Sequence, residues 1–380
     1  IMTISITFNA SHLKSFNLDV SAKFRILLVP ESRFEPKDFH YIILLDKSLS
    51  MKGEKLQMAK EGANELVSSL PQESYFSLLA FDEKVSILKE HSQSHLIDID
   101  EIKAGSGTSL YKALEEASKL AERYRQPSYL ILLTDGVPTD RGCTHGLSRK
   151  FDLERCLPVY QGLSLPHNVQ VISFGIGQDY NEKILSLISE KGNGFFYHIK
   201  DPKEIVEKMP KLAKSSVAAK NVTVDIISES AVKLLNYNDV PIKINAVEGI
   251  VKILGETVIP KGYQGKFMTI KVSYEDENGS NSKTIEYSLT TAKDQEDFFN
   301  GVNKDIIMEY EYLKTLRDYS RDVGELNLVE ATKKLEKLRQ IAEQTRRTDL
   351  LEATEELTRR KSGDPKEIES EVTRKMRDQS

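Results

Sequence analysis

Between residues 39 and 219, short apolar runs alternate with amphipathic patterns that are typical of helices. The first run, residues 41–45, is continuously apolar, as expected for a strand buried on both faces of its sheet. Helices are expected at residues 53–70, 109–124, 151–162, 181–190 and 202–219, and further strands at residues 75–81, 129–134, 169–175 and 195–199. This alternation predicts an α/β fold, a Rossmann-like and mostly parallel sheet with helices on both faces.

The segments on either side of this region have the two-residue period of half-buried strands. Residues 2–36 alternate apolar and polar side chains, and residues 220–292 return to strand patterns with a hairpin turn at residues 277–280. Two strands alone bury no core. We therefore expect residues 2–36 and 220–292 to form one β-sandwich, with the α/β domain of residues 39–219 inserted between them.

From residue 294 onward the chain has a helical pattern. Apolar side chains recur at intervals of three and four residues, at Leu328, Ala331, Leu335, Leu338 and Ala342. We expect a helical region over residues 294–347. Beyond it the apolar stripe thins among many charged residues, which predicts a mobile charged tail over residues 348–380.

The charge balance excludes several function classes. Lys and Arg number 53 and Asp and Glu number 58, so the formal net charge is −5. This balance lacks the concentrated basic face of a nucleic-acid binder. No run reaches the about 18 apolar residues of a membrane-spanning helix, so no membrane insertion is expected. The first eight residues do not have the pattern of a secretory signal, and we expect a soluble, cytoplasmic protein.

The two cysteines, Cys143 and Cys156, leave three alternatives open. Reduced structural thiols are the favoured interpretation in a cytoplasmic chain. A disulfide between them is the second alternative, and it gains weight in a hyperthermophile. A zinc site that also uses His145 and His167 is the weakest, because the spacing matches no compact zinc motif.

Oxygen-bearing side chains lie in three loops between the predicted strands and helices. Asp46, Ser48 and Ser50 come directly after the first buried strand, Thr108 lies in a glycine-rich loop before a helix, and Asp135 ends another strand. Ligands of open α/β sheets bind at the carboxyl ends of the strands. Hydroxyl and carboxylate oxygens suit Mg²⁺ or Mn²⁺, with waters completing the shell. The alternative is structural, since Ser and Asp are also common turn and cap residues.

With these three loops in this order, residues 39–219 resemble the von Willebrand factor A (vWA) family and its metal-ion-dependent adhesion site (MIDAS). The resemblance implies weakly bound Mg²⁺ or Mn²⁺, contacted directly by the two serines and sometimes Thr108, and through water by the two aspartates. A partner's carboxylate would take the open position. The sequence departs from the commonest family pattern at Leu49, where many members have Gly, and at Lys47, whose charge could weaken metal affinity.

The whole layout resembles two groups of vWA proteins. One is the vWA, β-sandwich and helical arrangement of COPII-coat Sec proteins. The other is the archaeal regulatory vWA proteins of the archaellum regulatory network B type, which pair with forkhead-associated (FHA) partners. The latter resemblance implies a non-enzymatic scaffold in archaeal signalling, in archaellum (motility) or starvation regulation, with a Ser/Thr kinase and an FHA-domain phosphothreonine reader as partners.

Candidate phosphorylation sites lie near the C-terminus. They are Thr345, Thr348, Thr354, Thr358 and Thr373. Thr348 and Thr354 each have a leucine three residues later, the spacing that an FHA pocket reads.

Two other function classes remain. The chain could be a vWA accessory subunit of an AAA+ ATPase or chelatase-type machine. A metal-dependent hydrolase is disfavoured, because the sequence shows no pair of a base and a nucleophile.

Overall fold

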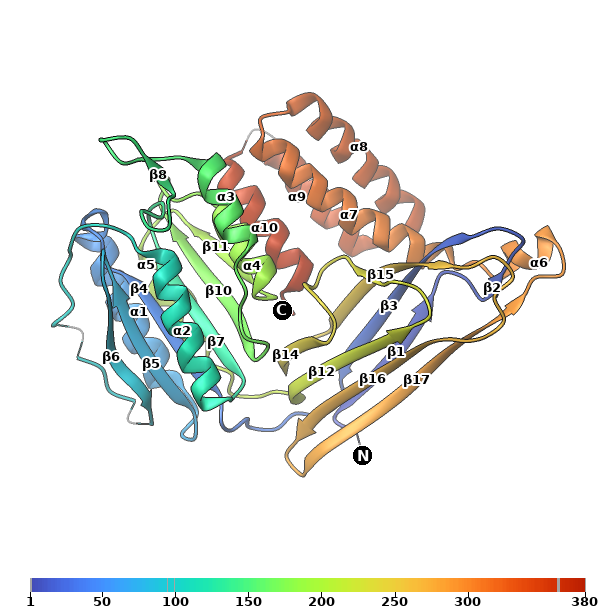
Figure 1. Ribbon diagram of the computed structural model, residues 1–380, viewed down its shortest axis with the longest axis horizontal. Helices are drawn as coiled ribbons and strands as arrows, with labels where there is room; N and C mark the ends of the chain where they lie inside the picture. The colour runs from blue at the N-terminus through green and yellow to red at the C-terminus, as the bar shows by residue number, and fades with distance from the viewer. Residues whose placement is uncertain (1, 94, 99, 361–362, 380) are drawn as a thin grey trace. The chain divides into compact units, whose positions relative to one another are not determined.

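The computed structural model describes residues 2–93, 95–98, 100–360 and 363–379 (Figure 1). The chain divides into two compact units, one of Phe34–Lys220 and one of Ile1–Arg33 together with Asn221–Ser380. The boundaries expected from the sequence for the inserted domain are 39 and 219.

The inserted unit is built on a six-stranded sheet with strand order β11-β10-β7-β4-β5-β6. Its strands are β4 (His40–Asp46), β5 (Tyr75–Phe81), β6 (Val85–Ser92), β7 (Ser128–Thr134), β10 (Val169–Ile176) and β11 (Phe195–Ile199). All neighbouring strands pair in parallel except β5 and β6. Every residue of the central strands β4 and β7 is buried, as their continuous apolar runs predict.

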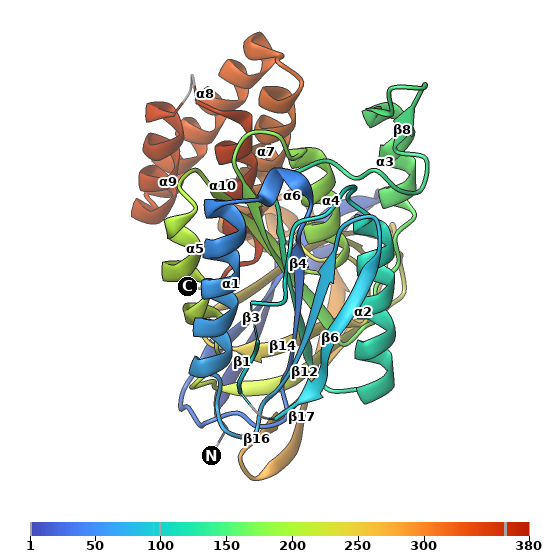
Figure 2. The ribbon, with the colours of Figure 1, turned by 90° about the vertical axis from the view of Figure 1, so that its left-hand side faces the viewer.

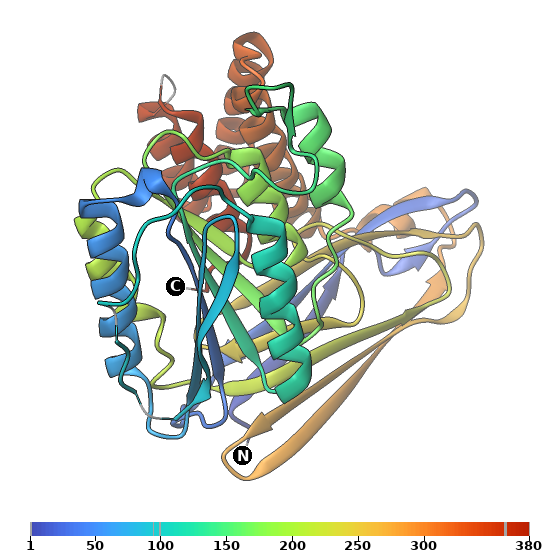
Figure 3. The same cartoon turned by 60° about the vertical axis from the view of Figure 1, so that its left-hand side comes forward.

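Helices cover both faces of this sheet. On one side lie α1 (Glu54–Ser69) and α5 (Lys203–Lys208), and on the other α2 (Leu110–Tyr124), α3 (Leu153–Gln161) and α4 (Glu182–Lys191) (Figures 2 and 3). Short elements lie between them: η1 (Leu49–Met51), the hairpin of β8 (Thr144–His145) and β9 (Lys150–Phe151), and η2 (Pro210–Leu212). Asp152 and Asn181 accept backbone N–H bonds as the N-caps of α3 and α4. The expected mostly parallel α/β sheet is confirmed.

The helix expected over residues 202–219 is shorter in the structure. Helix α5 ends at Lys208, and only the single turn η2 follows it. Pro210 has no backbone N–H with which to continue the helical ladder. The chain then enters a strand at Ala219.

The second unit contains two sheets that together form the predicted sandwich. Their orders are β1-β3-β15-β13 and β14-β12-β16-β17-β2. The strands are β1 (Ile4–Ala10), β2 (Lys14–Ser15), β3 (Val20–Pro30), β12 (Ala219–Ser228), β13 (Lys233–Leu234), β14 (Ile242–Val247), β15 (Val251–Ile259), β16 (Gly265–Asp276) and β17 (Gly279–Thr291). The N-terminal segment contributes to both sheets, because β3 pairs with β15 and β2 pairs with β17. The prediction of a sandwich divided by an inserted domain is therefore confirmed.

The core of the sandwich follows the alternation read from the sequence. The side chains of β3 that point inward are Val20, Ala22, Phe24, Ile26 and Leu28, and all are buried. Phe8 of β1 packs against Tyr287 of β17 with ring centroids 5.3 Å apart, which joins the two sheets. Phe24 leaves no room for a side chain opposite it, since a Cβ at Gly255 would lie 2.4 Å from its ring.

The C-terminal region is helical. It contains α6 (Gln295–Asn300), α7 (Lys304–Gly324), α8 (Leu328–Thr345), α9 (Thr348–Arg359) and α10 (Pro365–Arg377). Helices α7 to α10 share one apolar cluster, which includes Tyr312, Leu338, Leu357 and Ile368. None of the helices within the described residues is long and apolar enough to cross a membrane.

The prediction of a mobile charged tail over residues 348–380 is wrong for its described residues. Helices α9 and α10 occupy most of this segment and bury Leu357 and Ile368 completely. Beyond α10, the Gln379 Oε1 atom accepts a hydrogen bond of 2.7 Å from the Glu248 N–H. A thin apolar stripe is sufficient here because it faces α7 and α8, a partnership that local sequence does not reveal.

The structure also contains a buried His–Ser pair that the sequence analysis missed. His40, the first residue of β4, has its Nε2 2.7 Å from the Oγ of Ser77 on β5, and both residues are inaccessible. Burial, and secondly the nearby His91, lowers the pKa of His40 to about 3. The pair lies near the amino ends of β4 and β5, opposite the edge where α/β sheets bind ligands. We interpret it as a structural hydrogen bond.

Removing residues 2–33 should unfold the sandwich unit, because β3 lies between β1 and β15 and its loss exposes an apolar face. Residues 34–220 expressed alone should show one cooperative thermal transition. Calorimetry and circular dichroism of both truncated chains test this. Native-like melting of the sandwich after the deletion would contradict the strand pairing.

His40 should make stability dependent on pH. Its pKa is about 3 in the folded state against about 6.5 when unfolded, so the unfolded state binds more protons between these values. The contribution to stability is therefore complete above pH about 6.5 and is lost as the pH falls toward 3. His40→Gln, which keeps a polar group for Ser77, should reduce the pH slope of the unfolding free energy by at most about 1.4 kcal/mol per pH unit. Denaturant titrations at several pH values measure the unfolding free energy, and substitution of the exposed His167 by Gln is the control. Identical pH slopes in wild type and His40→Gln would contradict the lowered pKa of His40.

Candidate functional site

Three loops at the carboxyl edge of the inserted sheet carry the predicted oxygen side chains. Asp46 is the last residue of β4, and Asp135 directly follows β7. The glycine-rich loop before α2 runs beside the first loop, since Gly105 pairs with Ser48 and its N–H donates to the Lys47 carbonyl at 2.9 Å. A Cβ at position 105 would lie 2.1 Å from Asp82 Oδ2, so a larger residue there requires the Asp82 side chain to move.

Asp46 is a fully buried carboxylate. Its Oδ1 accepts a hydrogen bond from the Ser48 N–H, and its Oδ2 accepts one from the Thr134 hydroxyl, both at 2.8 Å. Burial raises the pKa of Asp46 to about 6 against these hydrogen bonds, and the negative charge of Asp135 adds to the increase. All its hydrogen-bond donors are neutral, so a positive charge nearby would stabilise the ionised form.

Asp135 completes a chain of oxygen atoms with the two serines. The Ser50 hydroxyl donates to Asp135 Oδ1 at 2.7 Å, and the Oγ atoms of Ser48 and Ser50 are 3.0 Å apart. Because the Ser50 proton is used on Asp135, the hydroxyl of Ser48 is the donor of this pair. Three of the five predicted side chains are thus connected directly, and the Asp46 carboxylate joins them through the backbone N–H of Ser48.

Thr108 is positioned by the loop that follows β7. Its backbone N–H donates to the Thr139 hydroxyl at 2.9 Å, and its carbonyl accepts from the Thr139 N–H at 2.9 Å. Its hydroxyl lies beside the Asp135 loop, 3.9 Å from where a Cβ on Gly136 would lie. The fifth predicted residue therefore lies next to the same loop.

Two lysines lie near this edge and behave differently. Lys47, which the sequence analysis expected to affect the metal, pairs instead with Asp82 at 3.2 Å. Asp82 also accepts from the Lys84 N–H, so it belongs to a strand-end turn. Lys55, which the sequence analysis did not single out, places its Nζ 3.0 Å from Asp135 Oδ2. The only sequence feature that could have identified Lys55 is its position in the first turn of the helix that follows the Asp46 motif.

The residues present fit a hard divalent cation. The donor set consists of carboxylate and hydroxyl oxygens, which Mg²⁺ and Mn²⁺ prefer. The Lys55 ammonium already places one positive charge against Asp135. Within the described part of the chain, no group of three or more His, Cys, Asp and Glu residues forms another metal site.

The favoured interpretation of two free thiols is wrong, because the structure joins Cys143 and Cys156 in a disulfide. The β8–β9 hairpin returns the chain so that the Asp152 N–H donates to the Cys143 carbonyl at 2.8 Å. Helix α3 then brings Cys156 back to Cys143. The zinc alternative is also wrong, since neither sulfur is a free thiolate, and His145 lies 3.3 Å from Asp152 instead.

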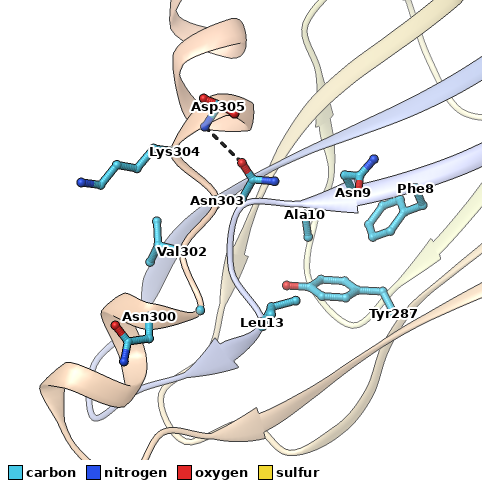
Figure 4. A pocket seen from close by; sticks show the side chains of 11 residues that line it. Phe8, Asn9, Ala10, Leu13, Tyr287, Asn300, Val302, Asn303, Lys304 and Asp305 are labelled. Carbon is cyan, nitrogen blue, oxygen red and sulfur yellow. Dashed lines mark hydrogen bonds between the residues drawn. The ribbon is translucent and has the colours of Figure 1, made fainter. Parts of the chain in front are cut away.

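The sandwich unit has an open cavity of about 600 Å³ between its strands and the connection from α6 to α7 (Figure 4). Phe8 and Tyr287 line one side. On the other, Asn303 accepts the Asp305 N–H at 3.1 Å as the cap of α7, and the Lys304 side chain points away from the two rings. The cavity has rings and amides but no cluster of reactive groups among its lining residues, so the oxygen site is the stronger candidate.

Comparison with known proteins agrees with this geometry. The family model for the von Willebrand factor type A domain matches residues 42–211, and the model for the archaellum regulatory network B C-terminal domain matches residues 304–378. The crystal structure of the ArnB paralog VWA2 from Sulfolobus acidocaldarius has a TM-score of 0.87 at 30% identity, covering 99% of this chain and 98% of that one. A von Willebrand factor type A protein from Catenulispora acidiphila has a TM-score of 0.68 at 15% identity, with 99% and 97% covered, and shows the fold alone.

Curated relatives share only part of the chain. An uncharacterized protein of Synechocystis is 28% identical over 177 residues, which is 45% of this chain and 40% of that protein. A von Willebrand factor A domain-containing protein of Dictyostelium discoideum is 21% identical over 66% of this chain and 29% of its own length. This chain thus spans less than half the length of these two relatives.

Because the match to the Sulfolobus structure extends over both chains, this chain belongs to the von Willebrand factor type A family, among the members that carry the archaellum regulatory network B C-terminal domain.

Proposed function

We propose that this protein is a cytoplasmic, non-enzymatic scaffold for protein–protein interaction in archaeal signalling, in archaellum (motility) or starvation regulation. It would bind one partner through a divalent cation on the vWA unit and another, an FHA-domain reader, through a threonine phosphorylated by a Ser/Thr kinase. The observation that carries the proposal is the convergence of two buried carboxylates and two serine hydroxyls at one sheet edge. Its combination with an archaellum regulatory network B C-terminal domain in one chain supports the signalling role.

The residues that would hold Mg²⁺ or Mn²⁺ are those of the three loops: Asp46, Ser48, Ser50, Thr108 and Asp135. When bound, the ion offers an open coordination position to a carboxylate of a partner protein. The chain orients the serine oxygens through the hydrogen bonds to Asp46 and Asp135. Leu49 lies between the two serines with 58% of its surface exposed, so it presents an apolar contact to whatever approaches the ion.

Asp46→Asn should abolish Mg²⁺ binding while leaving the melting temperature within a few degrees of wild type. Asparagine keeps an acceptor for the Ser48 N–H and removes a charge whose ionised form burial disfavours. Asp46→Ala should instead lower the melting temperature, because two buried donors lose their acceptor. Isothermal calorimetry with MgCl₂ and MnCl₂ measures binding, with Asp82→Asn as the matched control that should bind like wild type. Unchanged Mg²⁺ binding in Asp46→Asn would refute the metal assignment.

The structure separates the five candidate threonines by accessibility. Thr348, the first residue of α9, is exposed. Thr354 is 2% exposed, with its hydroxyl 3.0 Å from the Tyr312 hydroxyl and donating to the Leu350 carbonyl. Thr373 is also buried, and the hydroxyls of Thr345 and Thr358 donate to carbonyls of their own helices. A kinase can therefore reach Thr348 in the folded protein, whereas Thr354 requires α9 to open.

Phosphorylation at these two positions should have opposite effects. A phosphate on Thr348 would lie at the N-terminus of α9, where the helix dipole favours a negative charge, directly after Arg346 and Arg347 in the sequence. A phosphate on Thr354 would have to displace Tyr312 from the helical cluster. The leucine three residues after Thr348 is half-buried Leu351, so an FHA reader has less packing to break there than at fully buried Leu357.

Thr348→Ala should abolish phosphorylation-dependent binding of an FHA domain, whereas Thr354→Ala should retain it and cost about 1 kcal/mol of stability for the lost hydrogen bond. The measurement is fluorescence anisotropy with a labelled FHA domain, on protein treated with kinase and ATP and on phosphatase-treated protein. Thr354→Glu should lower the melting temperature and Thr348→Glu should not. Equal FHA binding by Thr348→Ala and wild type, or by the dephosphorylated protein, would contradict the assignment.

A further inference from the structure

Lys55 holds one of the two buried carboxylates of the site. It is the second residue of α1, and its Nζ contacts Asp135 Oδ2 at 3.0 Å. Asp135 has 0% of its side chain exposed and Lys55 has 30%, so the ammonium lies between the buried acid and solvent. Gly177, which follows β10, lies beside it: a Cβ there would be 3.5 Å from the Nζ atom.

The contacts of the two carboxylates show where positive charge is missing. Asp135 has the Ser50 hydroxyl on one oxygen and the Lys55 ammonium on the other. Asp46 has two neutral donors. Of the two buried carboxylates, only Asp135 therefore has a positively charged group among the contacts described. A divalent ion bound to the serine oxygens would lie close to this ammonium, and like charges repel strongly where solvent screening is weak.

We infer that Lys55 is a resident counter-cation of Asp135 that a divalent ion must displace, so that Lys55 sets the cation affinity of the site. The inference rests on the metal binding proposed above and assigns a role to a residue outside the five oxygen donors. Lys55 keeps the metal-free loops neutralised and folded, and it weakens the binding of the ion. Its partial exposure leaves a path for the side chain to turn into solvent when the ion arrives.

The neighbouring lysines provide matched controls. Lys47 is closer to the Asp46 motif in sequence, but its Nζ pairs with Asp82 at 3.2 Å. Lys52 is exposed. Removing either charge changes the net charge of the same region as much as removing Lys55 does, without releasing Asp135.

The test compares Mg²⁺ and Mn²⁺ binding by isothermal calorimetry in the full chain and in Lys55→Met, Lys55→Arg and Lys52→Met. Lys55→Met should bind about tenfold more tightly than wild type, equivalent to about 1.4 kcal/mol. The Mg²⁺ affinity of Lys55→Arg should remain within about twofold of wild type, because arginine keeps the positive charge. The affinity of Lys52→Met should also remain within about twofold, because solvent and salt screen an exposed charge. In the metal-free state, Lys55→Met should lower the melting temperature, and saturating Mg²⁺ should restore it.

The outcomes separate this inference from the proposed metal site. If wild type binds Mg²⁺ and Lys55→Met binds it equally or more weakly, the counter-cation role is wrong while the metal site stands. If neither protein binds Mg²⁺ or Mn²⁺, both are wrong. A double-mutant cycle with Asp135→Asn gives a readout without metal: Lys55→Met should destabilise wild type and have little effect in Asp135→Asn, and additive effects would overturn the pairing.

Discussion

The vWA unit depends on a carboxylate that is buried at the end of its central strand. Asp46 ends a strand with no exposed residue, and its neighbours supply neutral donors only. Burial of this charge is unfavourable unless surrounding groups compensate for it. The three loops at the sheet edge do so by placing serine hydroxyls and Lys55 around the Asp46–Asp135 pair. The same arrangement that satisfies two buried acids gathers the oxygen atoms that we propose as ligands of a cation.

A buried carboxylate also organises the other unit. Glu309 on α7 receives Arg25 of β3 at 2.8 Å, Arg347 at 2.9 Å and Lys252 of β15 at 3.5 Å. Burial opposes ionisation of Glu309, but the three cations together lower its pKa. Arg347 is the N-cap residue of α9 and also binds Asp349. The start of α9 is therefore tied to the sandwich sheet through Glu309, and Thr348 directly follows this connection.

The oxygen donors of the site were predictable because strand ends are readable from the sequence. A continuous apolar run identifies a buried parallel strand, and polar residues directly after it must lie at the carboxyl edge of the sheet. Asp46 and Asp135 follow from this rule. Lys55 does not follow from it, since its long side chain could pair with an acid or extend into solvent, and only packing selects between these arrangements. The disulfide was one of three alternatives for the same reason: the hairpin that brings Cys143 to Cys156 has strands of two residues, too short to leave a pattern.

The sequence by itself determined the α/β order of the inserted unit and the split sandwich, and it supplied the five oxygen side chains that we propose as the metal site. These depend on hydrophobic periodicity and on short motifs, both of which are local properties. Only the tertiary structure decided which charges pair, which threonines are accessible and whether the C-terminal segment folds. Thr348 and Thr354 are alike in the sequence, yet one is exposed and the other contacts Tyr312 in a buried cluster. Their difference arises from Tyr312 of α7, which is 42 residues from Thr354 in the chain. Burial against a distant element cannot be read from a local pattern.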